Sequence, residues 1–506
     1  MQNIQFLEQF MITFLLLIPV ILISRTVVAG TRYSPILIIV VFGLLMGLAL
    51  VGTNVTTPGL PDFPVVDLMS KVTVTALIAS FFVGGQELRR IFTKQSFKID
   101  EMVVPSSNEL FLGTKQTQFS YLIRAFFILI GIEGTKRLLL GTSPGDPLTS
   151  FYPLIAYLGF VGSVVLIDFG AVIKEKRLYL QKGVLEFGLI LSVLLISNYV
   201  ALFIKPLIGL PQIFFAMIIS ATAGMIFSKW VFGPTLRSLL FAGIPVVLAA
   251  NFIMGGSRIV EAFKLVSLYP VMTYGFFGQI FWMFAGISLL IFVGLANHIR
   301  NLAPGMAGSL SHSGLTGACT AGDFGDEAAL RAPIMINIPF VGHIFVFSIL
   351  AASATQDSLI LPWAIFIATV GIALTAWSMF VLRKANGIEA LEVKGLMIFC
   401  FGWQLTAIFS GFLFLNFTGM PLSDAAMASS SALSHFGLFA AIQEEMFGVH
   451  ASELIAFIFA MPFLVHPLVF GMFGRAAENN GVMPPRIALG LALIGLAGII
   501  YVGLFT

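Results

Sequence analysis

Charged residues are scarce in this chain of 506 residues: Asp, Glu, Lys and Arg together make up 10% of it. The net charge is +3, and the basic residues are spread along many short connections, which excludes a nucleic-acid-binding surface. The longest polar connection, Thr93 to Gln118, is too short to form a soluble domain. Hydrophobic residues make up 58% of the chain, and the mean hydropathy is +1.00. This composition excludes an ordinary soluble protein and predicts that a lipid bilayer surrounds the chain.

Cysteine and histidine are also scarce. The two cysteines, Cys319 and Cys400, lie far apart in the sequence, which excludes a disulfide framework. The 6 histidines form neither an HExxH motif nor a cluster with cysteine. We therefore expect no zinc site.

Long apolar runs are abundant. A run of about 18–25 apolar residues is long enough to cross a bilayer as a helix. The sequence therefore predicts an all-α polytopic membrane protein with about fourteen transmembrane helices. The runs lie near residues 9–29, 34–52, 70–88, 118–138, 150–172, 183–204, 206–229, 236–256, 273–296, 333–353, 359–382, 394–416, 454–474 and 485–505.

The basic residues predict the orientation of these spans, because Lys and Arg favour the cytoplasmic side. The connections after spans one, three, five and seven carry thirteen basic residues, and the opposite connections up to span nine carry six. The N-terminus is therefore expected outside, in a multi-pass protein of the cell (inner or plasma) membrane. The same bias predicts that Gly305–Leu330 enters the membrane and returns, because Arg383, Lys384 and Lys394 then fall inside.

Internal repeats are the strongest pattern in the sequence. Residues 310–350 lie on residues 433–473 at an offset of 123, with 14 of 41 positions identical and Leu-Ser-His at the start of both. A second repeat places 81–92 on 252–263, which matches Gly84-Gly85 with Gly255-Gly256. Each offset covers an odd number of spans, so we expect inverted repeats, a signature of many secondary transporters. The predicted domains are a first five-helix repeat (1–176), a second inverted repeat (177–383) with a hairpin at 305–330, and a partial third repeat (384–506) with a hairpin at 425–448.

The two polar segments predict one central site. Irregular backbone at membrane depth must be buried in protein or line water, and the six glycines of Gly305–Leu330 permit tight turns. We expect a helix–break–helix hairpin in each copy, with free N–H groups for a carboxylate and free carbonyls for Na⁺. The candidate substrate- and ion-binding residues are Ser311, His312, Ser313, Gly314, Thr316, Thr320, Asp323, Ser434, His435, Gly437, Gln443 and Asn251.

Several roles stay open at this point. His312 and His435 either bind substrate and relay protons or hold the broken backbone, whereas His343 and His466 are expected to be structural. The glycine pairs, Gly84-Gly85 and Gly255-Gly256, either break their spans or allow close helix packing. Four acids are either solvated at the hairpin ends or part of the site; they are Asp326, Glu327, Glu444 and Glu445.

The order of features from Leu210 to Leu350 resembles the second half of the glutamate:sodium symporter family, within the cation/proton antiporter-like and anion transporter group. The shared features are a span led by Leu-Pro, a span ending in Gly-Gly, a long apolar span and the His- and Gly-rich stretch SHSGLTGA (311–318). The first half, with its apolar run at 33–51 and FFVGGQELRRIF at 81–92, is similar to the matching opening. The resemblance implies two inverted five-helix units, a scaffold and a moving transport domain, a homodimer, and sodium-driven uptake of an acidic amino acid. It also implies that Ser311, His312, Ser313 and Gly314 form the core of the site.

The chain departs from the family pattern in two places. Ser150–Asp168 lacks the Gly- and His-rich break of the family's first half, and residues 384–506 lie outside the family's usual plan. We therefore hypothesise that the third repeat supplies the hairpin that the first half lacks.

Together these features predict a secondary transporter and not an enzyme. We expect an elevator-like, alternating-access symporter of a small anionic substrate such as glutamate, with Na⁺ or H⁺ as the coupling ion and no other cofactor. The alternatives are a cation/proton antiporter, an intramembrane serine hydrolase that uses Ser311 and His312, and a membrane scaffold without transport activity.

Overall fold

A computed structural model describes most of the C-terminal half of the chain and parts of the N-terminal half. The described residues are 35–51, 212–226, 252–293, 298–320, 323–341, 360–385, 388–435 and 449–505, with short pieces within 16–28, 81–89, 196–204, 248–249 and 346–353, and Leu438. Their regular secondary structure is helical. The chain divides into two compact units, one formed by 1–22, 58–207 and 212–251, the other by 23–57, 208–211 and 252–506.

In the first unit, helix α8 (Gln212–Ile226) packs closely against residues 81–89. A side chain at Gly85 would collide with the carbonyl oxygen of Ala221, and one at Gly224 would collide with that of Phe82. Arg89 Nη1 donates to the carbonyl of Met225 at 2.6 Å, at the C-terminal end of α8 where carbonyls lack helical partners. Here Gly85 permits close packing between helices, which is one of the two roles left open above.

The second unit begins with a similar glycine contact. Helix α2 (Pro35–Ala49) packs against the helical residues 252–262 through Gly47 and Gly256. A side chain at Gly256 would collide with the Leu44 carbonyl, and one at Gly255 would meet the Phe463 ring. Residues 252–262 are helical without a break, so Gly255 and Gly256 also serve packing.

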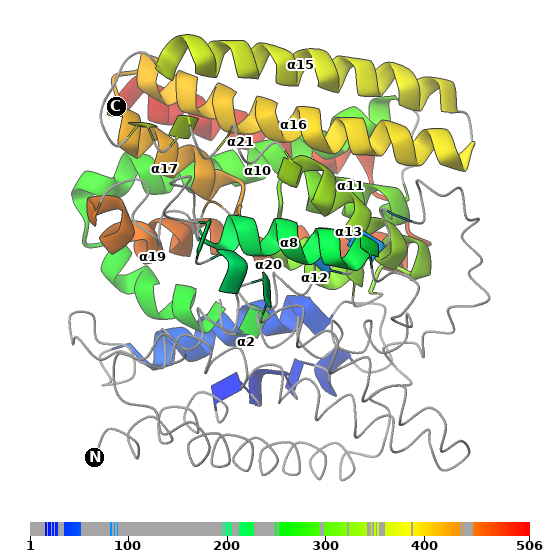
Figure 1. Ribbon diagram of the computed structural model, residues 1–506. Helices are drawn as coiled ribbons and strands as arrows, with labels where there is room; N and C mark the ends of the chain where they lie inside the picture. The colour runs from blue at the N-terminus through cyan, green and yellow to red at the C-terminus, as the bar shows by residue number, and fades with distance from the viewer. Residues whose placement is uncertain are drawn as a thin grey trace. The chain divides into compact units, whose positions relative to one another are not determined.

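The rest of this unit contains two successive sets of helices (Figure 1). After the short 3₁₀ turn η4 (Val266–Leu268), the first set is α10 (Tyr269–Phe292), α11 (Ile299–Ser309), α12 (Ser313–Thr320), α13 (Asp326–Val341) and α15 (Ile360–Ala385). The second set is α16 (Glu389–Phe417), α17 (Leu422–Ala432), α19 (Val449–Phe463), α20 (His466–Glu478) and α21 (Pro485–Phe505).

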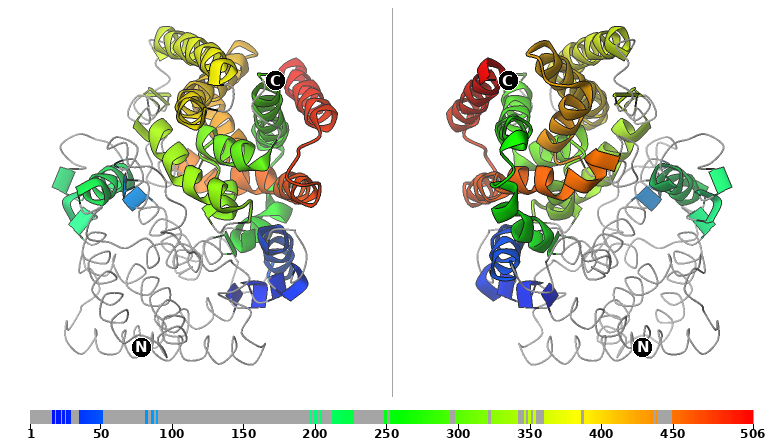
Figure 2. Two further views of the ribbon diagram at one scale, coloured as in Figure 1. Left: turned by 90° about the vertical axis from the view of Figure 1, so that its right-hand side faces the viewer. Right: turned by 90° about the vertical axis from the view of Figure 1, so that its left-hand side faces the viewer.

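The last helix of each set packs along the first helix of the other set, as the views in Figure 2 show. Helices α15 and α16 run antiparallel, with Gly371 against Thr406 and Gly402 against Thr375. Helices α10 and α21 also run antiparallel, with Gly495 against the backbone of Phe281. Glycine at each contact lets two backbones approach closely, as in membrane helix pairs.

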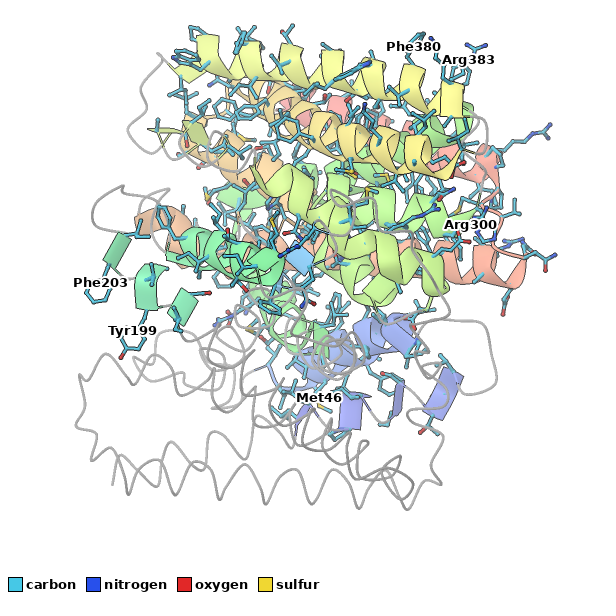
Figure 3. The ribbon with its side chains drawn as sticks, turned by 45° about the vertical axis from the view of Figure 1, so that its right-hand side comes forward. Met46, Tyr199, Phe203, Arg300, Phe380 and Arg383 are labelled. Atoms are coloured by element: carbon cyan, nitrogen blue, oxygen red, sulfur yellow. The ribbon has the colours of Figure 1, made fainter. Side chains whose placement is uncertain are left out.

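Five helices in the described residues are long and apolar enough to cross a membrane. They are Val266–Phe292, Ile360–Ala385, Ala390–Phe417, Phe457–Glu478 and Pro485–Leu504. Helix α15 exposes large apolar side chains, among them Trp363, Phe366 and Trp377. At its C-terminal end, Phe380 and Arg383 project outward (Figure 3), and Lys384 Nζ lies 4.1 Å from the Phe380 ring centroid. An apolar outer face with basic residues at one end is typical of a lipid-facing helix. The prediction of an all-helical membrane protein is therefore confirmed for this part of the chain.

Two predicted spans differ from the helices found. The apolar run at 454–474 is interrupted by a turn at 464–465 between α19 and α20, because Pro467 at the start of α20 cannot donate a helical N–H. Helix α13 begins at Asp326, seven residues before the predicted start at 333. Its first turns carry Asp326, Glu327 and Arg331, and such charges lower the hydropathy by which a span is recognised.

Candidate functional site

Helices α11, α12 and α13 form an up–down–up arrangement. At the start of α11, Arg300 Nη1 lies 3.3 Å from the Glu327 carboxylate at the start of α13. At the end of α11, Gly308 lies against the backbone of Met335. Helices α11 and α13 are therefore parallel, and the intervening α12 returns towards the start of α11.

A left-handed serine ends α11. Ser311 has φ +48°, and the backbone N–H groups of Leu310, Ser311 and His312 donate to the carbonyls of Met306, Gly308 and Ala307 at 3.0–3.2 Å. This is a Schellman-type end, in which glycine is the usual left-handed residue. It uses carbonyls that we expected to be free for a cation, so fewer of them remain at this helix end.

His312 begins the returning helix α12. Its ring Nδ1 accepts the backbone N–H of Leu315 at 3.2 Å, in the manner of an N-cap. Its carbonyl accepts the Thr316 hydroxyl at 3.0 Å. A side chain at Gly314 would meet the rings of Phe470 and His312, so only glycine fits there without displacing them. His312 is fully buried, and its cap holds the broken backbone.

The break after α17 has the same construction. Ser434 has φ +49°, and His435 Nδ1 accepts the backbone N–H of Leu438 at 3.1 Å. The two breaks meet, because His312 and His435 form an antiparallel bridge. Both histidines are fully buried.

A pair of glutamines connects the two breaks. The Gln279 amide lies 3.0 Å from His312 Nε2 and 2.8 Å from Ser434 Oγ. The Gln404 amide lies 2.8 Å from both His435 Nε2 and Ser311 Oγ. Each glutamine therefore binds the histidine of its own set and the serine of the other. We call these six residues the crossing: Gln279, Ser311, His312, Gln404, Ser434 and His435.

The crossing lies midway along the two long helices. Gln279 is the eleventh of 24 residues in α10, and Gln404 is the sixteenth of 29 in α16. The two helices cross here, where Trp403 Nε1 donates to the Trp282 carbonyl at 3.1 Å. Our sequence reasoning missed both glutamines. A polar side chain in the middle of a long apolar helix is the signal that would have indicated them.

Helices α11 and α17 reach the crossing from opposite ends of α10. Towards the C-terminal end of α10, Gly286 lies against Met306 of α11. Towards its N-terminal end, Gly275 lies against Ser431 of α17. Since α11 and α17 both end at the crossing, their tips meet halfway along α10.

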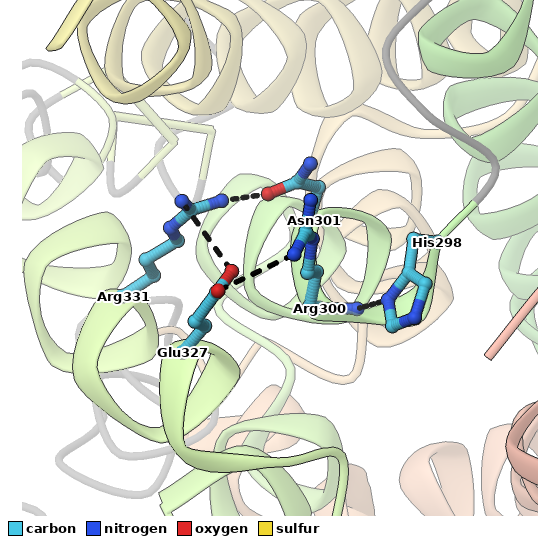
Figure 4. A network of polar contacts seen from close by, with 5 residues as sticks. All are labelled: His298, Arg300, Asn301, Glu327 and Arg331. Atoms are coloured by element: carbon cyan, nitrogen blue, oxygen red, sulfur yellow. Dashed lines mark hydrogen bonds and ion pairs between the residues drawn. The ribbon is translucent and has the colours of Figure 1, made fainter. Parts of the chain in front are cut away.

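An ionic network ties the base of the first hairpin (Figure 4). The Glu327 carboxylate lies between Arg300 and Arg331, at 3.3 and 3.7 Å, and Arg331 also donates to Asn301 Oδ1. His298 Nδ1 accepts the backbone N–H of Arg300 at 3.2 Å. Burial and, to a smaller extent, the positive charge of Arg300 lower the pKa of His298. This favours the neutral imidazole, whose Nδ1 can accept the hydrogen bond. Glu327 is thus paired with two arginines and not simply solvated.

His466 packs at the side of the crossing. Its Nδ1 lies 3.1 Å from the Pro462 carbonyl, and its ring centroid lies 4.6 Å from that of His312. The rings of Phe252 and Phe463 meet it edge-on. The Nε2 atom of His466 is buried and has no hydrogen-bond partner among the described residues. His343 lies outside the described residues.

The other predicted site residues are dispersed. Ser313 and Thr320 lie on α12, and Asp323 is half-buried beyond the far end of that helix, about 12 Å of helical rise from His312. The Thr316 hydroxyl is used within α12. Six predicted residues lie outside the described part of the chain: Gly84, Asn251, Gly437, Gln443, Glu444 and Glu445.

The crossing contains no nucleophile–base pair. Both serine hydroxyls are bonded to glutamine amides, not to a histidine nitrogen. Among the aspartates and glutamates whose side chains the structure describes, none is buried. No family model, characterised protein or solved structure matches this chain.

Proposed function

We propose that this protein is a secondary active transporter whose substrate site is the crossing. The observation that supports this proposal most strongly is that two broken helices, with the same left-handed serine and capping histidine, meet midway along two long apolar helices. In this proposal α10–α15 and α16–α21 are inverted repeats, and the two hairpins enter the bilayer from opposite faces. Sites at repeat interfaces near the bilayer midplane are the rule for such transporters.

The cost of the breaks supports a functional role. Lipid cannot satisfy free N–H and C=O groups, so a break is tolerated only inside protein or beside water. A left-handed non-glycine residue costs about 1–2 kcal/mol, and this chain uses one at both breaks. Polar residues at such depth are usually retained for function.

For the substrate we propose a small carboxylate such as glutamate, carried together with Na⁺. The side chains of the crossing are two glutamines, two serines and two capping histidines, none of them acidic or permanently cationic. A carboxylate bound there alone would lose its hydration without gaining a counter-charge. Because a bound Na⁺ would supply that charge, each ligand would favour binding of the other, which is the basis of symport.

The proposed transport cycle also requires the crossing to move within the membrane. Alternating access requires that the crossing face each side of the membrane in turn. The elevator-like mechanism implied by the family resemblance achieves this by moving both hairpins and their site together against a scaffold.

Uptake into proteoliposomes tests the proposal. The purified protein is reconstituted, and accumulation of labelled L-glutamate is measured with an inward Na⁺ gradient, an inward H⁺ gradient, or neither. We expect accumulation that depends on the Na⁺ gradient. Accumulation only with the H⁺ gradient would change the coupling ion. No accumulation of glutamate, succinate or lactate under any gradient would reject carboxylate symport.

A further inference from the structure

Gln279 has one amide atom without a hydrogen-bond partner among the described residues. The residue is fully buried, and the partnerless atom is the one directed away from His312 and Ser434. Gln404, which occupies the same place in the other half of the crossing, has no such atom and makes a further interaction. A buried polar atom without a partner is costly and needs an explanation.

The tautomer of His312 identifies that atom. Nδ1 of His312 accepts the Leu315 N–H, so Nδ1 carries no proton. A neutral imidazole with an unprotonated Nδ1 carries its proton on Nε2, and Nε2 is the atom that faces the Gln279 amide. The atom of Gln279 next to His312 must therefore accept a hydrogen bond.

If the Gln279 amide nitrogen faced His312 Nε2–H, two hydrogen-bond donors would face each other with no acceptor between them. A half-turn of the terminal amide puts the oxygen there instead, since the two ends of an amide have nearly the same shape. The oxygen then accepts from His312 Nε2–H and from the Ser434 hydroxyl, at the same 3.0 and 2.8 Å. The atom without a partner is then the NH₂ group, a donor of two hydrogen bonds.

We propose that the Gln279 NH₂ group binds the hydrogen-bond-accepting group of the ligand, a carboxylate oxygen, and that it does not bind a cation. The adjoining start of α12 favours the same chemistry. The N–H groups of Ser313 and Gly314 have no acceptor within their own helix, and a helix N-terminus carries partial positive charge. Gln279 contacts His312, the residue directly before α12, so its NH₂ group and this helix start belong to the same half of the crossing. In this proposal that half determines specificity.

This inference rests on the proposed function, but measurements of ligand binding test it without a transport assay. The full-length protein in detergent is titrated with the sodium salts of L-glutamate, succinate and lactate, and thermal unfolding is followed. Choline chloride, LiCl and NaCl serve as the cationic probes, and NaCl at equal Na⁺ concentration is the reference for each sodium salt. For the wild type we expect a carboxylate to raise the unfolding temperature and choline and Li⁺ to have no effect.

The decisive variant is Gln279→Glu, which keeps an oxygen towards His312 and replaces the NH₂ group by oxygen. We expect it to weaken carboxylate binding by about tenfold to a hundredfold. Gln404→Glu, which introduces the same charge in the other half, is the matched control and is expected to weaken binding several-fold less. Gln279→Met, a neutral unbranched replacement, repeats the test if the buried carboxylate prevents folding.

Two outcomes overturn the inference. They are a wild type that none of the three carboxylates stabilises, and equal losses of carboxylate binding in Gln279→Glu and Gln404→Glu. Carboxylate binding that depends on Gln279, without uptake into proteoliposomes, would leave this inference standing and reject the transport proposal. The two failures are therefore distinguishable.

Discussion

The two breaks have nearly the same tip but differ at their bases. At both tips a left-handed serine ends one helix, a histidine caps the next, and the other half's glutamine binds the serine. At the base of the first hairpin, Arg300, Glu327 and Arg331 form an ionic network. The positions 123 residues later are Ser423, His450 and Leu454, which cannot form the same network. In the proposed function, the shared tip builds the substrate site, and the unshared features give its two sides different tasks.

Replacing either glutamine by leucine should have the largest effect. Each change removes the glutamine partner of a buried histidine and of a buried serine hydroxyl, at roughly 1–3 kcal/mol for each group. We expect Gln279→Leu and Gln404→Leu to lower the free energy of unfolding by similar amounts, roughly 2–6 kcal/mol. Unfolding in mixed micelles of detergent and SDS measures this. A loss in only one variant would show that the two tips are not equivalent.

The left-handed serines offer a finer comparison. Alanine removes the hydroxyl and keeps the backbone strain, whereas glycine removes both. At Ser311 and at Ser434, the glycine variant should therefore be more stable than the alanine variant by about 1 kcal/mol. The same unfolding assay measures the difference. Alanine variants as stable as glycine variants would contradict the left-handed geometry.

The base of the first hairpin should give the smallest effect on stability. Glu327→Gln removes the carboxylate between two guanidinium groups, but the carboxylate is 36% exposed. We therefore expect a loss of about 0.5–1 kcal/mol, which is below the range for charged hydrogen bonds because solvent screens the pair. Arg383→Gln, at the exposed end of α15, is the control and should change stability by less than about 0.5 kcal/mol. A change at Glu327 no larger than that at Arg383 would remove the distinction between the bases.

The sequence predicted much of this comparison. Long apolar runs indicated the long helices, and the Leu-Ser-His duplication indicated both breaks. The glutamines were missed because the offset of 123 pairs Gln279 with Gly402, while the crossing pairs it with Gln404, 125 positions away. The structure shows why: six residues connect α10 to α11, whereas four connect α16 to α17. An ungapped alignment of the two repeats therefore loses its register at this connection, because the connection differs in length between them.

The sequence also could not predict the contacts across the crossing. Nothing in local pattern states that Ser311 binds a glutamine of the other set, because such pairing depends on how the sets pack. Likewise, the sequence left open whether Glu327 is solvated at the hairpin end. The structure pairs it with Arg300 and with Arg331, which is itself buried against Asn301.

The most direct measurement of the two-hairpin site is Na⁺-driven uptake of L-glutamate by Ser311→Gly and Ser434→Gly in proteoliposomes. Glycine suits the left-handed backbone, so these variants remove one hydroxyl from each hairpin with the least disturbance of the fold. If both hairpins form one site, each variant should raise the apparent KM by about fivefold or more. An unchanged KM in either variant would contradict a single site built from both hairpins.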